Sequence, residues 1–364
     1  MRKLRIAAIS FLNTAPLMWD FDHSKLGSEF DIISTIPSEC AELLRTGAAD
    51  IGIVPVVAYT YIPDLRVIPN IAIAGLLLEF PARMRKLRIA AISFLNTAPL
   101  MWDFERTDLG REFDIISTVP SECAEMLRTG AADIGIVPVV AYTYIPDLRI
   151  IPNVAIAAKG SVRSILLVSK VPLEEVGTVA ADTSSRTSVA LARVLFHKWM
   201  GGARQFTSMP PLLDVMLKCC DAALLIGDPA LTVDRTRYVC YDLAEEWKRL
   251  TGHPFVFAFW AVRASALQET EIDLTKIFQE SRDHGLANVN TLAREWAPRV
   301  GISEQAVRTY LTESIDYSLD QENLAGLELF FRYAVECGVL PGRRPLEFVG
   351  EAKTIGSSGD RVIG

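Results

Sequence analysis

The residues best suited to chemistry in this chain lie in the stretch DTSSRTSVAL, Asp182–Leu191. The stretch follows a strand pattern, opens a helical one, and carries several hydroxyl groups beside an arginine. The first backbone N–H groups of a helix lack partners within the helix, and the helix dipole favours negative charge there. We therefore predict an anion site at Ser185, Arg186, Thr187 and Ser188, the alternative being an ordinary Ser/Thr helix cap. Because the glycines of a phosphate-binding loop are missing, a carboxylate fits better than a nucleotide.

Further polar groups stand where predicted strands begin or end. SFLNTAP places Ser93 and Asn96 after a strand; an asparagine amide either orients a substrate through hydrogen bonds or simply forms a turn. LIGDPAL ends a buried strand at Gly227, which permits close approach of a ligand, and at Asp228, which either caps the next helix or acts on a proton. Ser164, in RSILL, opens another strand.

Several familiar catalytic patterns are absent from the sequence. There is no Ser-His-Asp set, no G-x-S-x-G, no dinucleotide fingerprint and no Cys/His spacing of a zinc site. The 6 cysteines include no C-x-x-C pair and are predicted to be reduced. His253, in TGHPFVF, is predicted to be structural. The sequence thus predicts neither a metal nor a cofactor.

The composition is that of a globular protein. The chain has 364 residues and a net charge of -7, with no cluster of Lys or Arg, which argues against nucleic acid or an anionic membrane as a partner. The basic, apolar start is like a signal peptide, but Asn13 and Pro16 interrupt it and no A-x-A site follows. No apolar run is long enough to span a membrane, so we expect a cytoplasmic protein. The oligomeric state is left open.

The elements that position these residues alternate between strands and helices. Strands at 88–94, 113–117 and 133–139 flank helices that start near Thr97 and at Pro120. A second series follows Pro172, and RSILLVSK and FVFAFWAVR (255–263) connect the two series. This pattern predicts an α/β protein with two lobes and a central cleft. Open α/β sheets bind ligands at the carboxyl ends of their strands, which places the polar stretches above at that cleft.

The opening MRKLRIAAISFLNTAPLMWDF occurs at Met1 and again at Met84, and the two copies match as far as Ala74 and Ala157. Only the second copy continues into the rest of the protein, so we expect it to form the working lobe. We expect the first copy to pack loosely, to pair with a sheet edge or to swap in for the second. The predicted parts are a duplicated partial lobe (1–83), the start of the first lobe (84–170) and the second lobe (171–258). The return strand with the helical part of the first lobe (259–350) and a tail (351–364) complete the chain.

Taken in order, six blocks of the sequence resemble the chorismate dehydratases of the futalosine route to menaquinone: SFLNTAPL, DIGIVP, SVRSILLVS, DTSSRTSV, DAALLIGDPAL and DLAEEWKRLTGHPFVFAFWA. The resemblance runs from about Arg88 to Arg263 and weakens beyond. It implies a fold like that of the type II periplasmic binding proteins, used in an enzyme that dehydrates chorismate to 3-[(1-carboxyvinyl)oxy]benzoate. A sister family, which makes 1,4-dihydroxy-6-naphthoate, carries a catalytic His where this chain has Gly227, and this departure favours the dehydratase.

The resemblance also suggests roles for the candidate residues. Chorismate is a dicarboxylate, so the segment Ser185–Ser188 is expected to bind one carboxylate. Asn96, with Ser93, would orient the ring substituents or the leaving hydroxyl, and Ser164, Gly227 and Asp228 would complete the cleft, with Asn96 and Asp228 as the catalytic residues. No protein base stands out, so we expect a substrate carboxylate to take the C3 proton. The rival hypotheses are that the chain has the sister activity or that it is a non-catalytic carboxylate-binding protein.

Overall fold

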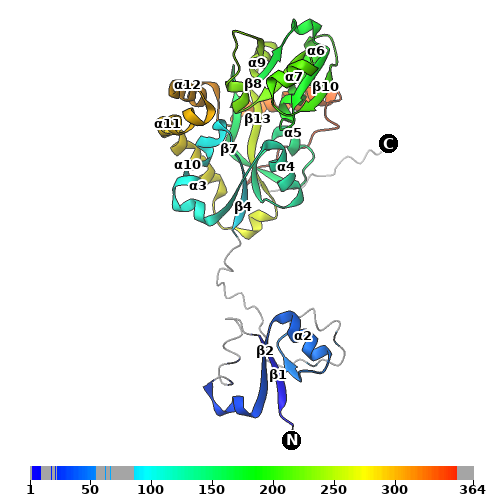
Figure 1. Cartoon of the computed structure of the whole chain (residues 1–364), viewed down its shortest axis with the longest axis vertical. Coiled ribbons are helices and arrows are strands. Elements are labelled where there is room, and N and C mark those ends of the chain that lie inside the picture. The colour runs from blue at the N-terminus through cyan, green and yellow to red at the C-terminus, as the bar shows by residue number, and fades with distance from the viewer. Residues whose placement is uncertain are drawn as a thin grey trace, which may run out of the picture. The chain divides into compact units, whose positions relative to one another are not determined.

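The structure is a computed structural model that describes residues 2–9, 23–54 and 86–350, together with Met18, Phe21, Ile62 and Arg66. The chain divides into two compact units, Met1–Arg83 and Met84–Gly364, which are treated separately here (Figure 1). Asn13 and the predicted tail, 351–364, lie outside the described residues.

The second unit contains two five-stranded sheets, one in each lobe. The sheet of the first lobe has the order β5-β4-β6-β13-β7, and its strands are β4 (Leu87–Ile92), β5 (Phe113–Thr118), β6 (Ile134–Pro138), β7 (Leu148–Ala158) and β13 (Phe255–Arg263). Strand β4 runs parallel to β5 and β6, whereas β13 runs antiparallel to β6 and β7. The central strands are apolar and buried on both faces, as expected for a covered sheet.

Helices cover this first sheet, and further helices follow its last strand, β13, along the chain. They are η3 (Leu95–Met101), α3 (Trp102–Arg106), η4 (Asp108–Glu112), α4 (Pro120–Thr129), α5 (Val139–Tyr142), η6 (Ala266–Glu269), α10 (Leu274–Ala287), α11 (Val289–Val300), α12 (Glu304–Thr309), the π-helical turn η7 (Tyr310–Ser314) and α13 (Gln321–Glu336). Helix α4 starts at its proline, as predicted, and ends at Gly130, whose φ of 78° closes the helix in the left-handed region. The predicted helix start near Thr97 is wrong in detail. A 3-10 helix begins at Leu95, and the Thr97 hydroxyl donates to the Phe94 carbonyl at 2.7 Å.

The sheet of the second lobe has the order β10-β9-β11-β8-β12. Its strands are β8 (Ile165–Ser169), β9 (Thr178–Asp182), β10 (Gln205–Met209), β11 (Ala222–Ile226) and β12 (Val239–Asp242). Its helices are η5 (Leu173–Glu175), α6 (Thr187–Trp199), α7 (Leu213–Cys219), α8 (Asp228–Leu231) and α9 (Leu243–Thr251). Figure 1 shows these elements gathered at the opposite end of the second unit from α3 and β4.

Two of the predicted lobe boundaries need correction. Strand β8 was expected in the first lobe, within 84–170, but it pairs antiparallel with β11 and β12 and so belongs to the second sheet. Strand β13, which the boundary at 258/259 would divide, lies wholly in the first sheet. The chain therefore crosses between the lobes in the short segments 159–164 and 252–254. Helix α13 also packs against α6, so the helical part predicted for the first lobe contacts both lobes.

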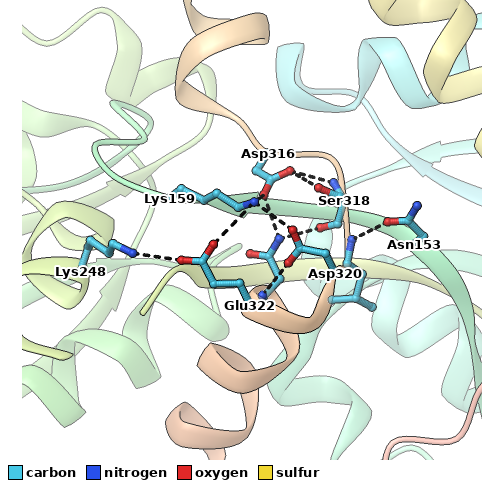
Figure 2. A network of polar contacts seen from close by, with 9 residues as sticks. Asn153, Lys159, Lys248, Asp316, Ser318, Asp320 and Glu322 are labelled. Carbon is cyan, nitrogen blue, oxygen red and sulfur yellow. Dashed lines mark hydrogen bonds and ion pairs between the residues drawn. The ribbon is translucent and has the colours of Figure 1, made fainter. Parts of the chain in front are cut away.

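A polar network fixes the crossing that follows β7 (Figure 2). The Lys159 ammonium lies 2.9 Å from an oxygen of Asp320 and 3.2 Å from one of Asp316, and these partners raise its pKa. Glu322 accepts a hydrogen bond from Lys248 of the second lobe at 3.2 Å. These charges are partly exposed, so each contributes little stability by itself. Together they define where the two lobes join.

The described part of the first unit repeats the start of the first lobe. Strands β1 (Leu4–Ile9), β2 (Phe30–Thr35) and β3 (Ile51–Gly52) form a sheet of order β2-β1-β3, accompanied by η1 (Lys25–Glu29) and α2 (Pro37–Arg45). The register equals that of the second copy, since Ile6 faces Ile32 as Ile89 faces Ile115. Strand β3 is shorter than β6. Strand β6 pairs with β13, whereas the sequence of the first copy contains no counterpart of β13 with which β3 could pair.

Candidate active site

Four strand ends meet where the two lobes touch. Strands β4 and β6 of the first sheet and β9 and β11 of the second all end there, as predicted for ligand sites in α/β sheets. We use the name lobe junction for the residue pairs that make contact across this boundary: Phe94 with Gly227, Leu95 with Asp228, Val140 with Thr187, Tyr144 with Arg186, and Tyr310 with Ser164.

Asp228 joins the lobes by a hydrogen bond. The backbone N–H of Leu95 donates to Asp228 Oδ1 at 3.0 Å. Helix α8 has no side-chain cap, so the expected capping role of Asp228 is wrong. Burial raises the pKa of the Asp228 carboxyl, and the Leu95 N–H partly opposes this rise. Asp228 thus fixes the backbone beside Asn96 from the opposite lobe.

Gly227 allows the lobes to approach closely, and the structure gives the reason. Its φ of 64° and ψ of -145° fall in a region that essentially only glycine occupies. A Cβ atom placed here would lie 3.0 Å from ring carbons of Phe94 in the other lobe. Phe94 is a junction residue that the sequence analysis missed, because an aromatic residue at the end of a buried strand is typical of a core.

Asn96 has a buried oxygen without a partner. Its Oδ1 accepts no hydrogen bond within the protein, although buried polar atoms are almost always paired. Asn96 lies in η3, next to the residue that Asp228 holds. Ser93, one turn earlier, is exposed, and its N–H lies 3.4 Å from the Thr118 carbonyl. An orphaned amide oxygen at a lobe boundary is available to a ligand.

The segment predicted to bind an anion lies at the start of α6. Ser185, Thr187 and Ser188 are buried, with exposed fractions of 7%, 4% and 3%. The Thr187 hydroxyl accepts from the Val140 N–H of the first lobe at 3.5 Å. Arg186 instead has an exposed side chain that donates to the Tyr144 hydroxyl. The structure therefore brings the hydroxyls to the lobe junction and places the Arg186 guanidinium outside the buried group.

Ser164 lies deep in the lobe junction. Its hydroxyl accepts a hydrogen bond of 2.8 Å from Tyr310, and its carbonyl accepts one of 2.9 Å from the Gly227 N–H. Tyr310 is 1% exposed, and burial raises the pKa of its phenol. Tyr310 could not be predicted from the sequence, because it lies in the helical carboxyl-terminal part, where no motif marks it.

His253 and His284 take no part in the contacts of the lobe junction. His253 lines a surface cavity beside α13 with Glu328 and Arg332, and His284 pairs with Asp103 at 2.8 Å. Over the described ranges, no group of three or more His, Cys, Asp or Glu is placed to hold a metal ion. Within the same ranges, no helix combines the length and apolar character needed to cross a membrane.

Comparisons with known proteins agree with this architecture. The chain is 29% identical to a chorismate dehydratase of Thermus thermophilus over 267 residues, which is 68% of this chain and 94% of the relative. A solved protein of Archaeoglobus fulgidus matches with a TM-score of 0.58 at 16% identity, over 70% of this chain and 98% of that one. The periplasmic aliphatic sulphonate binding protein of Escherichia coli matches with a TM-score of 0.51 at 16% identity, over 76% and 96%. The predicted periplasmic-binding-protein-like fold is thus confirmed.

The family comparison covers both copies of the repeat. The profile of a family described as menaquinone biosynthesis matches residues 4–76 and, separately, residues 87–336. The second match includes every residue pair of the lobe junction, whereas the first stops before any second lobe begins. This chain therefore belongs to the menaquinone biosynthesis family.

Proposed function

We propose that this chain dehydrates chorismate to 3-[(1-carboxyvinyl)oxy]benzoate, and that the lobe junction of residues 84–364 is the active site. The observation that carries the proposal is the orphaned Asn96 oxygen, next in sequence to Leu95, whose N–H donates to Asp228 of the other lobe. The dehydratase relative and the family supply the reaction class. We further propose that the enzyme works in the cytoplasm, as suits a biosynthetic enzyme.

The start of α6 is proposed to bind one substrate carboxylate. The first N–H groups of this helix, with the hydroxyls of Ser185, Thr187 and Ser188, form a neutral set of donors at the positive end of the helix dipole. Arg186 adds positive charge from outside the buried group. The second carboxylate of the substrate remains free to accept a proton.

Asn96 is proposed to orient the leaving hydroxyl, together with Ser93 and Ser164. The elimination breaks the C3–H bond, forms the C3–C4 double bond with that electron pair, and expels the C4 hydroxyl, which leaves as water after gaining a proton. Aromatisation of the ring favours the products. The second substrate carboxylate takes the C3 proton, so the protein contributes orientation, water exclusion and hydrogen bonds to the departing oxygen.

The geometry at Gly227 favours this function over the sister activity. A catalytic His at this position would have its Cβ within 3.0 Å of the Phe94 ring and its backbone in a region reserved for glycine. The other rival, a non-catalytic carboxylate-binding protein, would bind chorismate and return it unchanged. The test is to incubate the purified chain with chorismate and follow the substrate mass, with binding measured by calorimetry. Tight binding without loss of water would establish the rival and exclude the enzyme.

Asp228→Asn is expected to keep most of the activity, whereas Asp228→Ala is expected to lose much of it. The asparagine oxygen still accepts the Leu95 N–H, but alanine releases the backbone beside Asn96. We expect a loss in kcat of under about tenfold for the first variant and of about hundredfold for the second. If Asp228→Asn lost about hundredfold in kcat with binding retained, Asp228 would instead be the base.

The variant Asp228→Asn should also differ from the wild type in thermal stability. Because the folded-state pKa of Asp228 is raised above its unfolded value, ionising the carboxyl disfavours the folded state, and this penalty grows as pH rises through the raised pKa. Asp228→Asn removes the penalty. Its Tm should therefore exceed the wild-type Tm at neutral pH, and the difference should vanish below about pH 4, where Asp228 is protonated in both states. Thermal unfolding measured at both pH values checks this.

A chain shortened to begin at Met84 is expected to keep the full activity per molecule. The second unit contains both five-stranded sheets and all the pairs of the lobe junction, whereas the described residues of the first unit form one three-stranded sheet. Turnover of chorismate by the two chains, compared at equal molar concentration, is the measurement. An inactive short chain beside an active long one would mean that residues 1–83 supply part of the site.

A further inference from the structure

We propose that Tyr310 is a positioning residue, which holds the Ser164 hydroxyl so that its proton points at the oxygen atom leaving the substrate. The proposal rests on the function proposed above and assigns a role to a part of the chain, the turn η7, that carries no recognisable motif. Tyr310 itself need not touch the substrate.

The placement of Tyr310 is unusual and tightly defined. It opens the π-helical turn η7, and single π-helical turns are frequent at functional sites. This turn packs against η3, which carries Asn96. Tyr310 is 1% exposed, and its hydroxyl donates to Ser164 Oγ at 2.8 Å. The hydroxyl pair thus joins η7 to the crossing segment that carries Ser164, and η7 also packs against η3.

The chemistry of the pair fixes the direction of the serine proton. A phenol buried to this extent stays protonated and acts as a donor, since burial raises its pKa. Ser164 Oγ accepts this hydrogen bond, so its own O–H points away from Tyr310. The Ser164 carbonyl accepts from the Gly227 N–H, which fixes the serine beside Asp228. Accepting a hydrogen bond also makes Ser164 a better donor, through cooperativity along the chain of hydroxyls.

The protein offers a matched control in Tyr317. This second tyrosine is 4% exposed, lies in the same stretch of chain, and has a hydroxyl without a partner in the protein. Phenylalanine at either position removes one buried hydroxyl and keeps the ring. At position 310 the change removes the donor to Ser164, and at position 317 it removes no hydrogen bond.

The experiment uses the full chain with Tyr310→Phe, Ser164→Ala, both changes together, and Tyr317→Phe. We expect each of the first two variants to lower kcat about 10- to 100-fold with KM within about threefold of wild type. Because Tyr310 acts through Ser164, the double variant should be no slower than Ser164→Ala. Tyr317→Phe should keep wild-type kcat. The Tm of every variant is measured to check that each protein is folded under the conditions of the kinetic assay.

Two outcomes would overturn the proposal. One is a wild-type kcat in Tyr310→Phe, and the other is a double variant in which the two losses in kcat multiply. If Tyr310→Phe does not fold, wild-type kcat in Ser164→Ala alone rejects the proposal, and a lowered kcat at unchanged KM supports it. If the wild-type chain binds chorismate without turning it over, the proposed function has failed. The same four variants are then compared by their Kd for chorismate, where additive effects reject the coupling and non-additive effects support it.

Discussion

Replacing Asn96 with leucine is expected to slow dehydration about hundredfold without weakening the fold. The Asn96 Oδ1 atom is buried and accepts no hydrogen bond within the protein, so its removal breaks no described bond of that oxygen. A buried polar group left unpaired costs about 1–3 kcal/mol, so leucine should leave the Tm unchanged or raise it. If the amide oxygen orients the leaving hydroxyl by accepting a hydrogen bond from it, its loss should lower kcat by about 10²-fold.

The duplicated chain contains its own control for this change. Asn13 is the counterpart of Asn96 in the first copy, so Asn13→Leu makes the same substitution in the same local sequence. We expect it to leave kcat unaltered. Wild-type kcat in Asn96→Leu would reject the proposed role of the amide. A fall in kcat for Asn13→Leu equal to that for Asn96→Leu would show that the first copy takes part in the site.

Gly227→Ala should be the most damaging single change in the lobe junction. The backbone angles there cost a non-glycine residue about 1–3 kcal/mol, and the new Cβ would lie 3.0 Å from the Phe94 ring. The lobes would have to separate, which lengthens the Leu95–Asp228 hydrogen bond of 3.0 Å. We expect a lower Tm and a fall in kcat/KM of about hundredfold or more, since small displacements of positioning groups are costly in catalysis.

Two further variants separate backbone strain from loss of lobe contact. Gly252→Ala introduces the same atom at a φ of 76° with no neighbour within 4 Å, so it should lower the Tm and spare kcat/KM. Phe94→Leu combined with Gly227→Ala shortens the opposing side chain and should restore part of the activity. Equal effects of the two alanines on kcat/KM would contradict a role for close approach at Gly227.

The sequence predicted most of the framework because its strands are long apolar runs closed by turn residues. The predicted strand 255–263 matches β13, and the segments that follow the predicted strand ends contact each other across the lobes at Leu95, Thr187 and Asp228. Hydrophobic patterning cannot tell which sheet a buried strand joins, so β8 was assigned to the wrong lobe. Strand pairing is a long-range property, and the local sequence of β8 is equally apolar on both faces.

The candidate site was predicted less completely, because side-chain partners depend on the fold. Asp228 follows a glycine and precedes a proline at a helix start, a pattern typical of capping, and only the meeting of the lobes gives it Leu95 as a partner. Arg186 stands among the hydroxyls in the sequence, yet its long side chain extends to Tyr144. Tyr310 reaches Ser164 from 146 residues away, and no spacing rule connects positions so distant.

The central claim is that one site, at the lobe junction of the second unit, removes water from chorismate. Its most direct test is the mass of chorismate after incubation with the full chain and, in parallel, with Asn96→Leu. The account predicts a product lighter by one water with the full chain and, after the same short incubation, largely unchanged chorismate with the variant. Unchanged chorismate with the full chain, or equal conversion by both proteins, would contradict it.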